Sequence, residues 1–283
     1  MPETLARARH IEALGYDHLW TYDHLSWRRY RNRTWFSALP WLTGMAGATE
    51  RIRLGTMVAT PNLRHPVTLA QDSITLDHVS GGRFILGLGA GGVGFDSTVF
   101  GADALTPREL VARLDEFVAL LARLFAEPEV SHAGVYYSVR EAVIRPESLQ
   151  RPRIPLAIAA AGAKALGVVA QRGDAWITFS AAGNEELTPA RAVDIARTQM
   201  QRLDDACTAI GRDPSTIARI YLIGNTVERP LASTAAFADF AGRYDEIGFT
   251  DLVFHHPRPD DPVWDEPESI VDEIAGEVLP RLS

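Results

Sequence analysis

An Asp-His pair stands at the end of an apolar segment near the start of the chain. In the segment DHLWTYDHL, which spans residues 17–25, Asp23 and His24 are flanked by aromatic residues that could wall a pocket. A carboxylate accepts hydrogen bonds, and an imidazole gains or loses a proton near neutral pH. The pair is therefore a candidate for proton transfer to a bound small molecule, although the same two residues would also suit a structural role.

A run of glycines ends a second apolar segment. The run GLGAGGVG covers residues 87–94 and satisfies the G-x-G-x-x-G pattern of dinucleotide-binding loops twice. Such loops open directly into a helix, whereas here the residues FDSTVFGADALTP come before the next long helix. The run instead predicts a loop whose backbone lies close to a flat ligand or to a neighbouring strand, since only glycine permits so close an approach.

Gly162 marks a third position that could bind a ligand. It lies between the predicted strand PLAIAAA and the predicted helix AKALGVVAQ. Backbone N–H groups in the first turn of a helix have no partner within the helix and attract anions. The residues around Gly162 are therefore expected to bind a phosphate group.

The other histidines carry weaker indications. His255 and His256 end the last predicted strand, and with His24 they would suggest a metal site, but no H-x-H or H-E-x-x-H spacing accompanies them. No metal is therefore expected. His65 precedes a proline at the start of a predicted helix and is interpreted as a cap, and His18 is interpreted as a hydrogen-bonded core residue.

Apolar segments alternate with amphipathic helices along the chain, and these elements must position the candidate residues. A first helix shows apolar residues at Leu5, Ala8, Ile11 and Leu14 and ends at Gly15. Apolar runs of the kind buried on both faces of a parallel sheet predict strands near residues 17–25, 52–60, 84–89, 155–160, 175–180, 217–225 and 250–255.

The order of these elements favours one α/β barrel. Helices between the strands begin with recognisable caps, such as Thr106 with Glu109 three residues later, and Thr188 before a proline. Repeated β-α units without a long break in composition favour a (β/α)8 TIM barrel over a doubly wound sheet, as a single domain over residues 1–283. About seven strands are found, as if the first strand of a barrel were lacking. Residues 130–152 predict a short β excursion.

Composition and charge exclude several classes of function. The chain of 283 residues carries a formal net charge of −8 without a basic stripe, which argues against a nucleic-acid partner. No apolar run reaches the roughly 20 residues that cross a bilayer, so we expect no membrane partner. The first residues, MPETLARARHIEALG, lack the apolar core of an export signal, and a cytoplasmic location is expected.

Cys207 and a patch of arginines are interpreted as structural residues without a role in binding or catalysis. Cys207, the single cysteine, lies in a stretch with helical spacing and is interpreted as a packing residue. The arginines within WRRYRNRTW are either solvated or grip an anionic ligand, and the solvated alternative is preferred. They are Arg28, Arg29, Arg31 and Arg33.

Three segments of the chain resemble one family of enzymes. These are EALGYDHLWTYDHL, ERIRLGTMVATPNLRHPVTLAQDSITLDHVSGGRFILGLGAG and PLAIAAAGAKALGVVAQRGDAWI. They look like the corresponding segments of bacterial luciferase-like monooxygenases, and the resemblance spans nearly the whole chain. It implies a (β/α)8 barrel that binds a flavin or the deazaflavin coenzyme F420 at the carboxyl ends of the strands.

The resemblance favours F420 over flavin mononucleotide (FMN). Members that use FMN tend to carry Glu-His-His where this chain has Asp23, His24 and Leu25, whereas deazaflavin members tend to carry Asp-His. In the deazaflavin branch, the matching segment holds a non-prolyl cis peptide bond behind the ring. The resemblance therefore implies a cis bond between Met57 and Val58.

The same resemblance implies roles for single residues. Asp23 and His24 would face the ring and the substrate as the catalytic residues, with His24 as the acid or base. The other implied cofactor contacts are Met57 and Val58 behind the ring, Ala90 and Gly91 at its edge, and Gly162 and Ala163 at the cofactor phosphate. Deazaflavin sugar-phosphate dehydrogenases carry a Glu where this chain has Gly92 and two glycines where it has Gly162 and Ala163. A sugar phosphate is therefore not the expected substrate.

The leading hypothesis is hydride transfer between F420 and a small organic substrate. The alternatives are an FMN-dependent monooxygenase fed by a separate flavin reductase, a hydrolase with a histidine-bound metal, and a cofactor-binding protein without catalysis. The resemblance also allows a homodimer, for which the sequence itself carries no sign.

Overall fold

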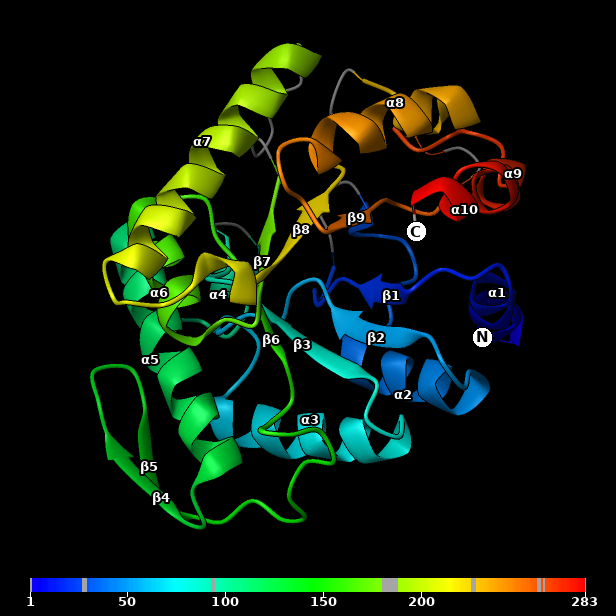
Figure 1. The fold of residues 1–283 in the computed structure, drawn as a ribbon. Helices are drawn as coiled ribbons and strands as arrows, with labels where there is room; N and C mark the ends of the chain where they lie inside the picture. The colour runs from blue at the N-terminus through cyan, green and yellow to red at the C-terminus, as the bar shows by residue number, and fades with distance from the viewer. Residues whose placement is uncertain are drawn as a thin grey trace. The chain divides into compact units, whose positions relative to one another are not determined.

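The computed structural model describes residues 2–26, 30–92, 95–179, 188–224, 228–258, 261 and 263–282. Contacts divide the chain into two compact units, and each is described by itself. The first unit comprises Met1–Ala159 and Arg172–Asp174, and the second comprises Ala160–Gln171 and Ala175–Ser283. Figure 1 labels the helices and strands of both units.

Parallel strands form the sheet of the first unit. They are β1 (His18–Thr21), β2 (Arg53–Thr56), β3 (Phe84–Leu88) and β6 (Leu156–Ala159), hydrogen-bonded in that order. Every residue of β3 is buried, as expected for an apolar run that is covered on both faces. Because the strands are parallel, the loops that follow β1, β2 and β3 lie at one edge of the sheet.

Helices cover the outer face of this sheet, and Figure 1 shows α2 and α3 alongside β2 and β3. The helices of the first unit are α1 (Pro2–Ala13), α2 (Ala38–Ala48), α3 (Pro66–Val79), α4 (Phe95–Thr98) and α5 (Pro107–Ala126). The predicted capping box starts α5, since the Glu109 amide donates to Thr106 Oγ1 and the Thr106 amide donates to the Glu109 carboxylate at 2.8 Å. The cap therefore fixes where α5 begins and where the preceding loop ends.

A hairpin interrupts the alternation after α5. Its strands β4 (Val130–Ala133) and β5 (Ser138–Ala142) are antiparallel, which confirms the β excursion predicted within residues 130–152. The Glu116 carboxylate of α5 accepts hydrogen bonds of 2.9 to 3.1 Å from the backbone amides of Val135, Tyr136 and Tyr137. Burial raises the pKa of Glu116, but a hydrogen bond from His132 and those from the amides outweigh it and lower the pKa overall.

The second unit continues the β/α pattern. Strands β7 (Ala175–Thr178), β8 (Ala218–Leu222) and β9 (Asp251–Val253) are parallel and pair in that order. Its helices are α6 (Ala163–Arg172), α7 (Pro189–Thr208), α8 (Thr234–Asp245), α9 (Ser269–Glu277) and α10 (Leu279–Leu282), with 3-10 turns η2 (Pro214–Thr216) and η3 (Pro230–Ala232). The predicted cap of α7 is present, because Thr188 Oγ1 accepts from the Arg191 amide at 3.3 Å.

Aromatic side chains form much of the core of the second unit. The rings of Tyr221 and Tyr244 have centroids 4.0 Å apart, and the Tyr244 hydroxyl donates to the Tyr221 hydroxyl at 2.9 Å. Trp176 and Phe249 stack with centroids 5.7 Å apart. Cys207 is fully buried, which agrees with its interpretation as a packing residue, and burial raises the pKa of its thiol.

Strand order distinguishes the two fold classes considered from the sequence. Within each unit the neighbouring strands follow chain order, apart from the separate hairpin, whereas a doubly wound sheet reverses direction at a switch point. The predicted (β/α)8 architecture is thereby confirmed. The described residues contain seven parallel strands, as predicted, which is one fewer than a complete barrel has.

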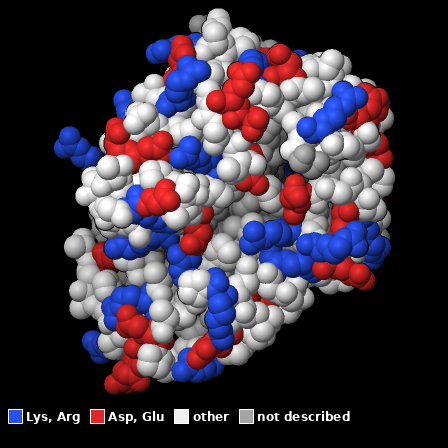
Figure 2. Space-filling view, viewed as in Figure 1, with Lys and Arg blue, Asp and Glu red and all other residues white. Residues whose placement is uncertain are grey.

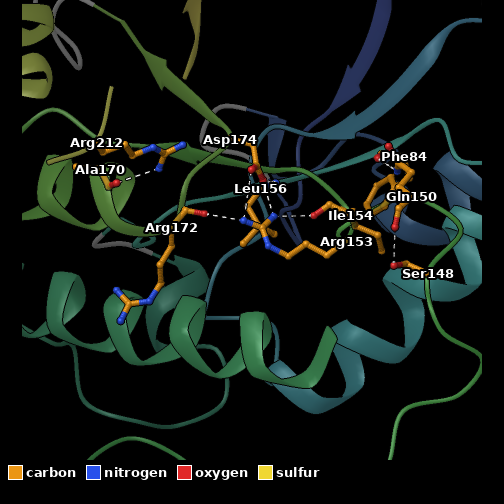
Figure 3. Close-up of polar contacts among 10 residues, drawn as sticks. All are labelled: Phe84, Ser148, Gln150, Arg153, Ile154, Leu156, Ala170, Arg172, Asp174 and Arg212. Carbon is orange, nitrogen blue, oxygen red and sulfur yellow. Dashed lines mark hydrogen bonds and ion pairs between the residues drawn. The ribbon is translucent and has the colours of Figure 1, made fainter. Parts of the chain in front are cut away.

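The opposite edge of the first sheet is held by an ion pair. Arg153 Nη1 donates to Asp174 Oδ2 at 2.5 Å, and the same oxygen accepts from the Leu156 amide at 2.7 Å (Figure 3). Arg153 Nη2 also donates to the Arg172 carbonyl at 3.0 Å. These contacts fix the start of β6. In barrel proteins this edge serves stability, and chemistry belongs to the other edge.

The surface carries charges of both signs. On the face shown in Figure 2, basic side chains have acidic side chains beside them. That face therefore presents no broad basic surface of the kind that neutralises a row of phosphates. Within the described segments, no helix is long and apolar enough to cross a membrane.

Gly87 of β3 and Gly167 of α6 offer a matched test of the packing. A Cβ added to Gly87 would lie 1.7 Å from the Thr56 carbonyl oxygen, whereas one added to Gly167 would meet nothing within 4 Å. We expect Gly87→Ala to lower the free energy of unfolding by about 3 kcal/mol or more, the upper range for overpacking. Gly167→Ala should raise it by up to about 1 kcal/mol, because alanine favours helix. Urea denaturation measures both, and equal stabilities would contradict the close approach of β3 to β2.

Candidate active site

Backbone hydrogen bonds join the loops that follow β1, β2 and β3. Met57 N donates to Thr21 O at 2.8 Å, and Ala59 N donates to Gly87 O at 2.8 Å. Gly89 N in turn donates to Ala59 O at 3.0 Å. The three loops are therefore held together at the edge where barrel proteins place their chemistry.

The peptide bond between Met57 and Val58 is cis, which confirms that prediction. Met57 is buried and Val58 is half-buried. A Cβ added to Gly89 would lie 2.5 Å from Val58 Cγ2, so Gly89 allows the loop after β3 to approach Val58. Part of the close approach predicted for the glycine run is therefore made by Gly89 to Val58, just after the end of strand β2.

Asn62 and Arg113 hold Gly91 and Gly92 of the glycine run, whose last two residues lie outside the described residues. Gly91 has a φ of +78°, and a Cβ there would lie 2.6 Å from Asn62 Nδ2. Asn62 Nδ2 donates to the Gly92 carbonyl at 3.2 Å, and Arg113 Nη2 donates to Asn62 Oδ1. A Cβ added to Gly92, in contrast, would meet nothing within 4 Å. Half-buried Ala90 and Gly91 therefore present a small, fixed surface, with open space at Gly92.

Asp23 forms a buried ion pair with Arg64. Arg64 Nε donates to Asp23 Oδ2 at 2.9 Å, and Arg64 Nη2 donates to Asp23 Oδ1 at 2.6 Å. The side chains of Asp23 and Arg64 are 2% and 20% exposed. The hydrogen bond to Asp23 raises the pKa of Arg64. Both carboxylate oxygens of Asp23 are therefore engaged by one guanidinium group, in the bidentate geometry that makes such pairs strong.

His24 contacts a different carboxylate. Its Nδ1 lies 2.5 Å from Asp96 Oδ2, and the side chains of His24 and Asp96 are 30% and 15% exposed. Asp96 belongs to the short helix α4 in the loop after β3, and its Oδ1 accepts from the Leu25 amide at 3.4 Å. The loops after β1 and β3 therefore meet at the candidate acid or base.

Aromatic rings flank His24, as the sequence suggested. The Tyr22 and Trp35 rings have centroids 5.9 Å and 6.3 Å from that of His24. Phe36, next to Trp35, stacks on Trp41 with centroids 4.8 Å apart. The Tyr22 and Trp35 rings give His24 a partly apolar setting in which a small organic molecule could be held.

The described part of the arginine patch rests on aromatic rings. The Arg31 guanidinium lies 4.5 Å from the centre of the Phe95 ring, and that of Arg33 lies 5.5 Å from the centre of Tyr30. Both arginines are exposed, as the solvated interpretation expects. Arg28 and Arg29 lie outside the described residues.

Gly162 and Ala163 belong to the second unit. Ala163 is the first residue of α6, and the Gly162 carbonyl accepts from the Leu166 amide at 3.0 Å. Both residues are exposed, and a Cβ added to Gly162 would meet nothing within 4 Å. Both residues therefore stand exposed at a helix start, and phosphate binding there stays a prediction.

The remaining histidines have structural surroundings. His255 stacks on Trp264 with centroids 4.5 Å apart, and burial, followed by Arg258, lowers its pKa to about 4. His65 caps α3, because its Nδ1 accepts from an amide two residues later at 3.3 Å. His18 lies in β1 and its Nδ1 accepts from Trp20 Nε1 at 3.1 Å, so the predicted hydrogen bond is present, but the residue is half-buried and not part of the core. Among the described residues, no group of three His, Cys, Asp or Glu side chains could hold a metal ion.

The first unit brings most of the predicted residues to one edge of its sheet. Those that lie on its three loops are Asp23, His24, Met57, Val58, Ala90 and Gly91. Four further residues that hold these loops carry no motif from which they could be predicted, namely Arg64, Asn62, Asp96 and Arg113. Weak signals existed, since Arg64 adjoins the capping His65 and Asp96 lies two residues after the glycine run.

Comparison with known proteins identifies the family. The sequence model described as luciferase-like monooxygenase matches residues 1–235. The chain belongs to the luciferase-like monooxygenase family.

Two relatives in this family and one solved structure resemble the chain over almost its full length. The F420-dependent glucose-6-phosphate dehydrogenases of Kineococcus radiotolerans and Beutenbergia cavernae are 37% and 32% identical, each over 96% of this chain and 90% of the relative. An F420-dependent secondary alcohol dehydrogenase, solved in complex with an F420-acetone adduct, has a TM-score of 0.80 at 18% identity and covers 99% of this chain and 94% of its own. The structural likeness shows that the two chains share a fold.

Proposed function

We propose that this luciferase-like protein is an F420-dependent oxidoreductase that transfers hydride between F420 and a small organic substrate. The proposal rests on the names of similar proteins and on the contact that His24 makes at one edge of the first sheet. Relatives that span 96% of the chain are named for F420-dependent dehydrogenation. The residue expected to move the proton, His24, lies there in contact with a carboxylate at 2.5 Å.

Each unit by itself has residues that suit one part of F420, its flat ring in the first unit and its phosphate group in the second. Open space at Gly92, beside the small residues Ala90 and Gly91, leaves room for the edge of a ring. The exposed amides at Gly162 and Ala163 suit a phosphate, because they lie at a helix start. F420, when bound, supplies the carbon that accepts or gives up a hydride.

His24 is the group we assign to the substrate proton. When an alcohol is oxidised, its O–H proton passes to the imidazole, and its carbon loses a hydride with two electrons to the cofactor. The alcohol becomes a carbonyl compound, and the reverse reaction returns both the proton and the hydride. An imidazole suits this exchange because it changes charge near neutral pH.

Asp23 is assigned an anchoring role in place of the proton transfer considered from the sequence. It is 2% exposed, and both of its oxygens are engaged by Arg64. A carboxylate in that setting is not free to exchange protons with a substrate. Its pairing instead holds the backbone beside His24 against the loop after β2.

We propose an apolar alcohol or carbonyl compound as the substrate in preference to glucose 6-phosphate. By the resemblance described above, Gly92 and Ala163 stand where deazaflavin sugar-phosphate dehydrogenases carry Glu and Gly. In addition, Leu25, Phe36 and Phe95 are exposed apolar residues on the loops that carry His24 and Asp96 or adjoin them. Such residues favour burial of an apolar molecule over a hydrated phosphate.

A turnover assay without oxygen tests the function. Purified protein would be mixed with oxidised F420 and either glucose 6-phosphate or a panel of secondary alcohols, and loss of the absorbance of the oxidised cofactor would be followed. We expect F420 reduction with at least one alcohol, at a higher kcat/KM than with glucose 6-phosphate. Faster reaction with glucose 6-phosphate would overturn the proposed substrate class.

The second candidate is an FMN-dependent monooxygenase supplied by a separate flavin reductase. The description of the family model, luciferase-like monooxygenase, favours it. Oxygen consumption that depends on substrate, reduced FMN and this protein would establish that reaction. The same preparation would then fail to reduce F420 with any alcohol.

A further inference from the structure

We infer that Asp96 fixes the tautomer of His24, so that Nε2 is the nitrogen that exchanges a proton with the substrate. The inference rests on the proposed function for its kinetic consequence only. His24 Nδ1 and Asp96 Oδ2 lie 2.5 Å apart. An ionised carboxylate accepts hydrogen bonds and cannot donate one, so the hydrogen between these atoms belongs to Nδ1. In the neutral ring, Nε2 then carries the lone pair.

Contacts with the loop after β1 hold Asp96 and its neighbour Phe95 in place. Its side chain is 15% exposed, and its second oxygen accepts from the Leu25 amide, which directly follows His24, at 3.4 Å. Phe95, its neighbour in α4, is covered by the Arg31 guanidinium at 4.5 Å. Two separate contacts therefore bring the loop after β3 to the loop after β1.

The carboxylate next to His24 in sequence, that of Asp23, has a different partner. Asp23 is its neighbour in sequence, but both oxygens of Asp23 are engaged by Arg64 at 2.9 and 2.6 Å. Within the described part of the chain, His24 Nε2 has no hydrogen-bond partner, and the side chain is 30% exposed. The ring is thus held at Nδ1 and open at Nε2.

This arrangement determines the path of the proton. In alcohol oxidation, the substrate O–H bond breaks and an N–H bond forms at Nε2, while the carbon passes its hydride to F420. The imidazolium that results keeps its Nδ1 hydrogen, and the charge of Asp96 stabilises it. Asp96 gains no proton at any stage, so it is a positioning residue for His24.

Nitrogen-15 NMR of the cofactor-free protein tests the tautomer directly. The ring nitrogens of His24 would be identified by their loss in His24→Gln, and spectra would be recorded at a pH where imidazole is neutral. We expect the Nδ1–H form in the natural chain and a shift toward the Nε2–H form in Asp96→Asn. An Nε2–H form in the natural chain would overturn the inference, whether or not the protein uses F420.

Kinetics provide a second readout that a merely structural role would not reproduce. Asp96→Asn should lower kcat by about 100-fold, within the range of a general acid or base contribution, and change KM less than threefold. Asp96→Glu should restore most of the rate, because it returns a carboxylate. Asp239→Asn is the matched control, since Asp239 is a 73% exposed surface partner of Arg243. Equal kcat values for Asp96→Asn and the natural chain would contradict the role of Asp96.

Discussion

His24→Ala is expected to lower kcat about 1,000-fold while leaving the affinity for F420 nearly unchanged. General acid or base catalysis by a placed side chain contributes about 10² to 10⁴ in rate, and His24 is a titratable side chain that is 30% exposed at the joined loops. The loss should fall on kcat, because the proton moves in the chemical step. Stability should change little, since a side chain that is 30% exposed leaves no large cavity.

Steady-state rates, fluorescence titration with F420 and thermal unfolding would be measured on the same preparations. His78→Ala is the matched control, because the exposed His78 side chain lies in the last turn of α3, and its Nε2 is hydrogen-bonded to the Glu147 carbonyl at 2.8 Å. That control should keep a kcat within about twofold of the natural chain, as surface substitutions usually do. If His24→Ala turned over every accepted substrate at the natural rate, the role of His24 in proton transfer would have to be abandoned.

Arg64→Met is expected to lower the free energy of unfolding by about 3 to 5 kcal/mol, because it leaves the carboxylate of Asp23 buried without its partner. Asp23 is 2% exposed, so solvent cannot take the place of the guanidinium. Methionine keeps much of the length and apolar stem of arginine. The expected loss is therefore mainly that of the ion pair.

A double-mutant cycle separates this effect from general loss of packing. Asp23→Asn combined with Arg64→Met should recover part of the stability, since a buried amide costs less than an unpaired carboxylate. Arg197→Met is the control, because Arg197 and Asp194 form an exposed pair at 3.2 Å, worth about 1 kcal/mol or less. Urea denaturation gives each value. An effect of Arg64→Met no greater than that of Arg197→Met would show that the pair at Asp23 contributes little.

Much of the fold could be predicted because its signals are local. The capping box at Thr106 and Glu109, the helix start at Thr188 and the order of apolar runs each depend on residues close in sequence. The ends of the strands were predicted less exactly. The strand predicted over residues 52–60 is observed only at Arg53–Thr56, because the chain then turns through the cis bond into the loop.

The candidate site was predictable only in part, because its pairings depend on distant residues. The sequence placed Asp23 beside His24, but it gave no sign that Arg64, 41 positions away, takes both oxygens of Asp23. His24 finds its partner Asp96 across 72 positions. Such partners are chosen by the way parallel strands bring their loops together, which no short pattern in the sequence records.

Binding of the two cofactors to the purified protein is the most direct test of the central claim, that this luciferase-like protein works with F420. Equal samples would be titrated with F420 and with FMN while the cofactor fluorescence is followed. The structure and the relatives lead us to expect saturable binding of F420 and no binding of FMN over the same concentrations. Tight binding of FMN, with none of F420, would contradict the claim.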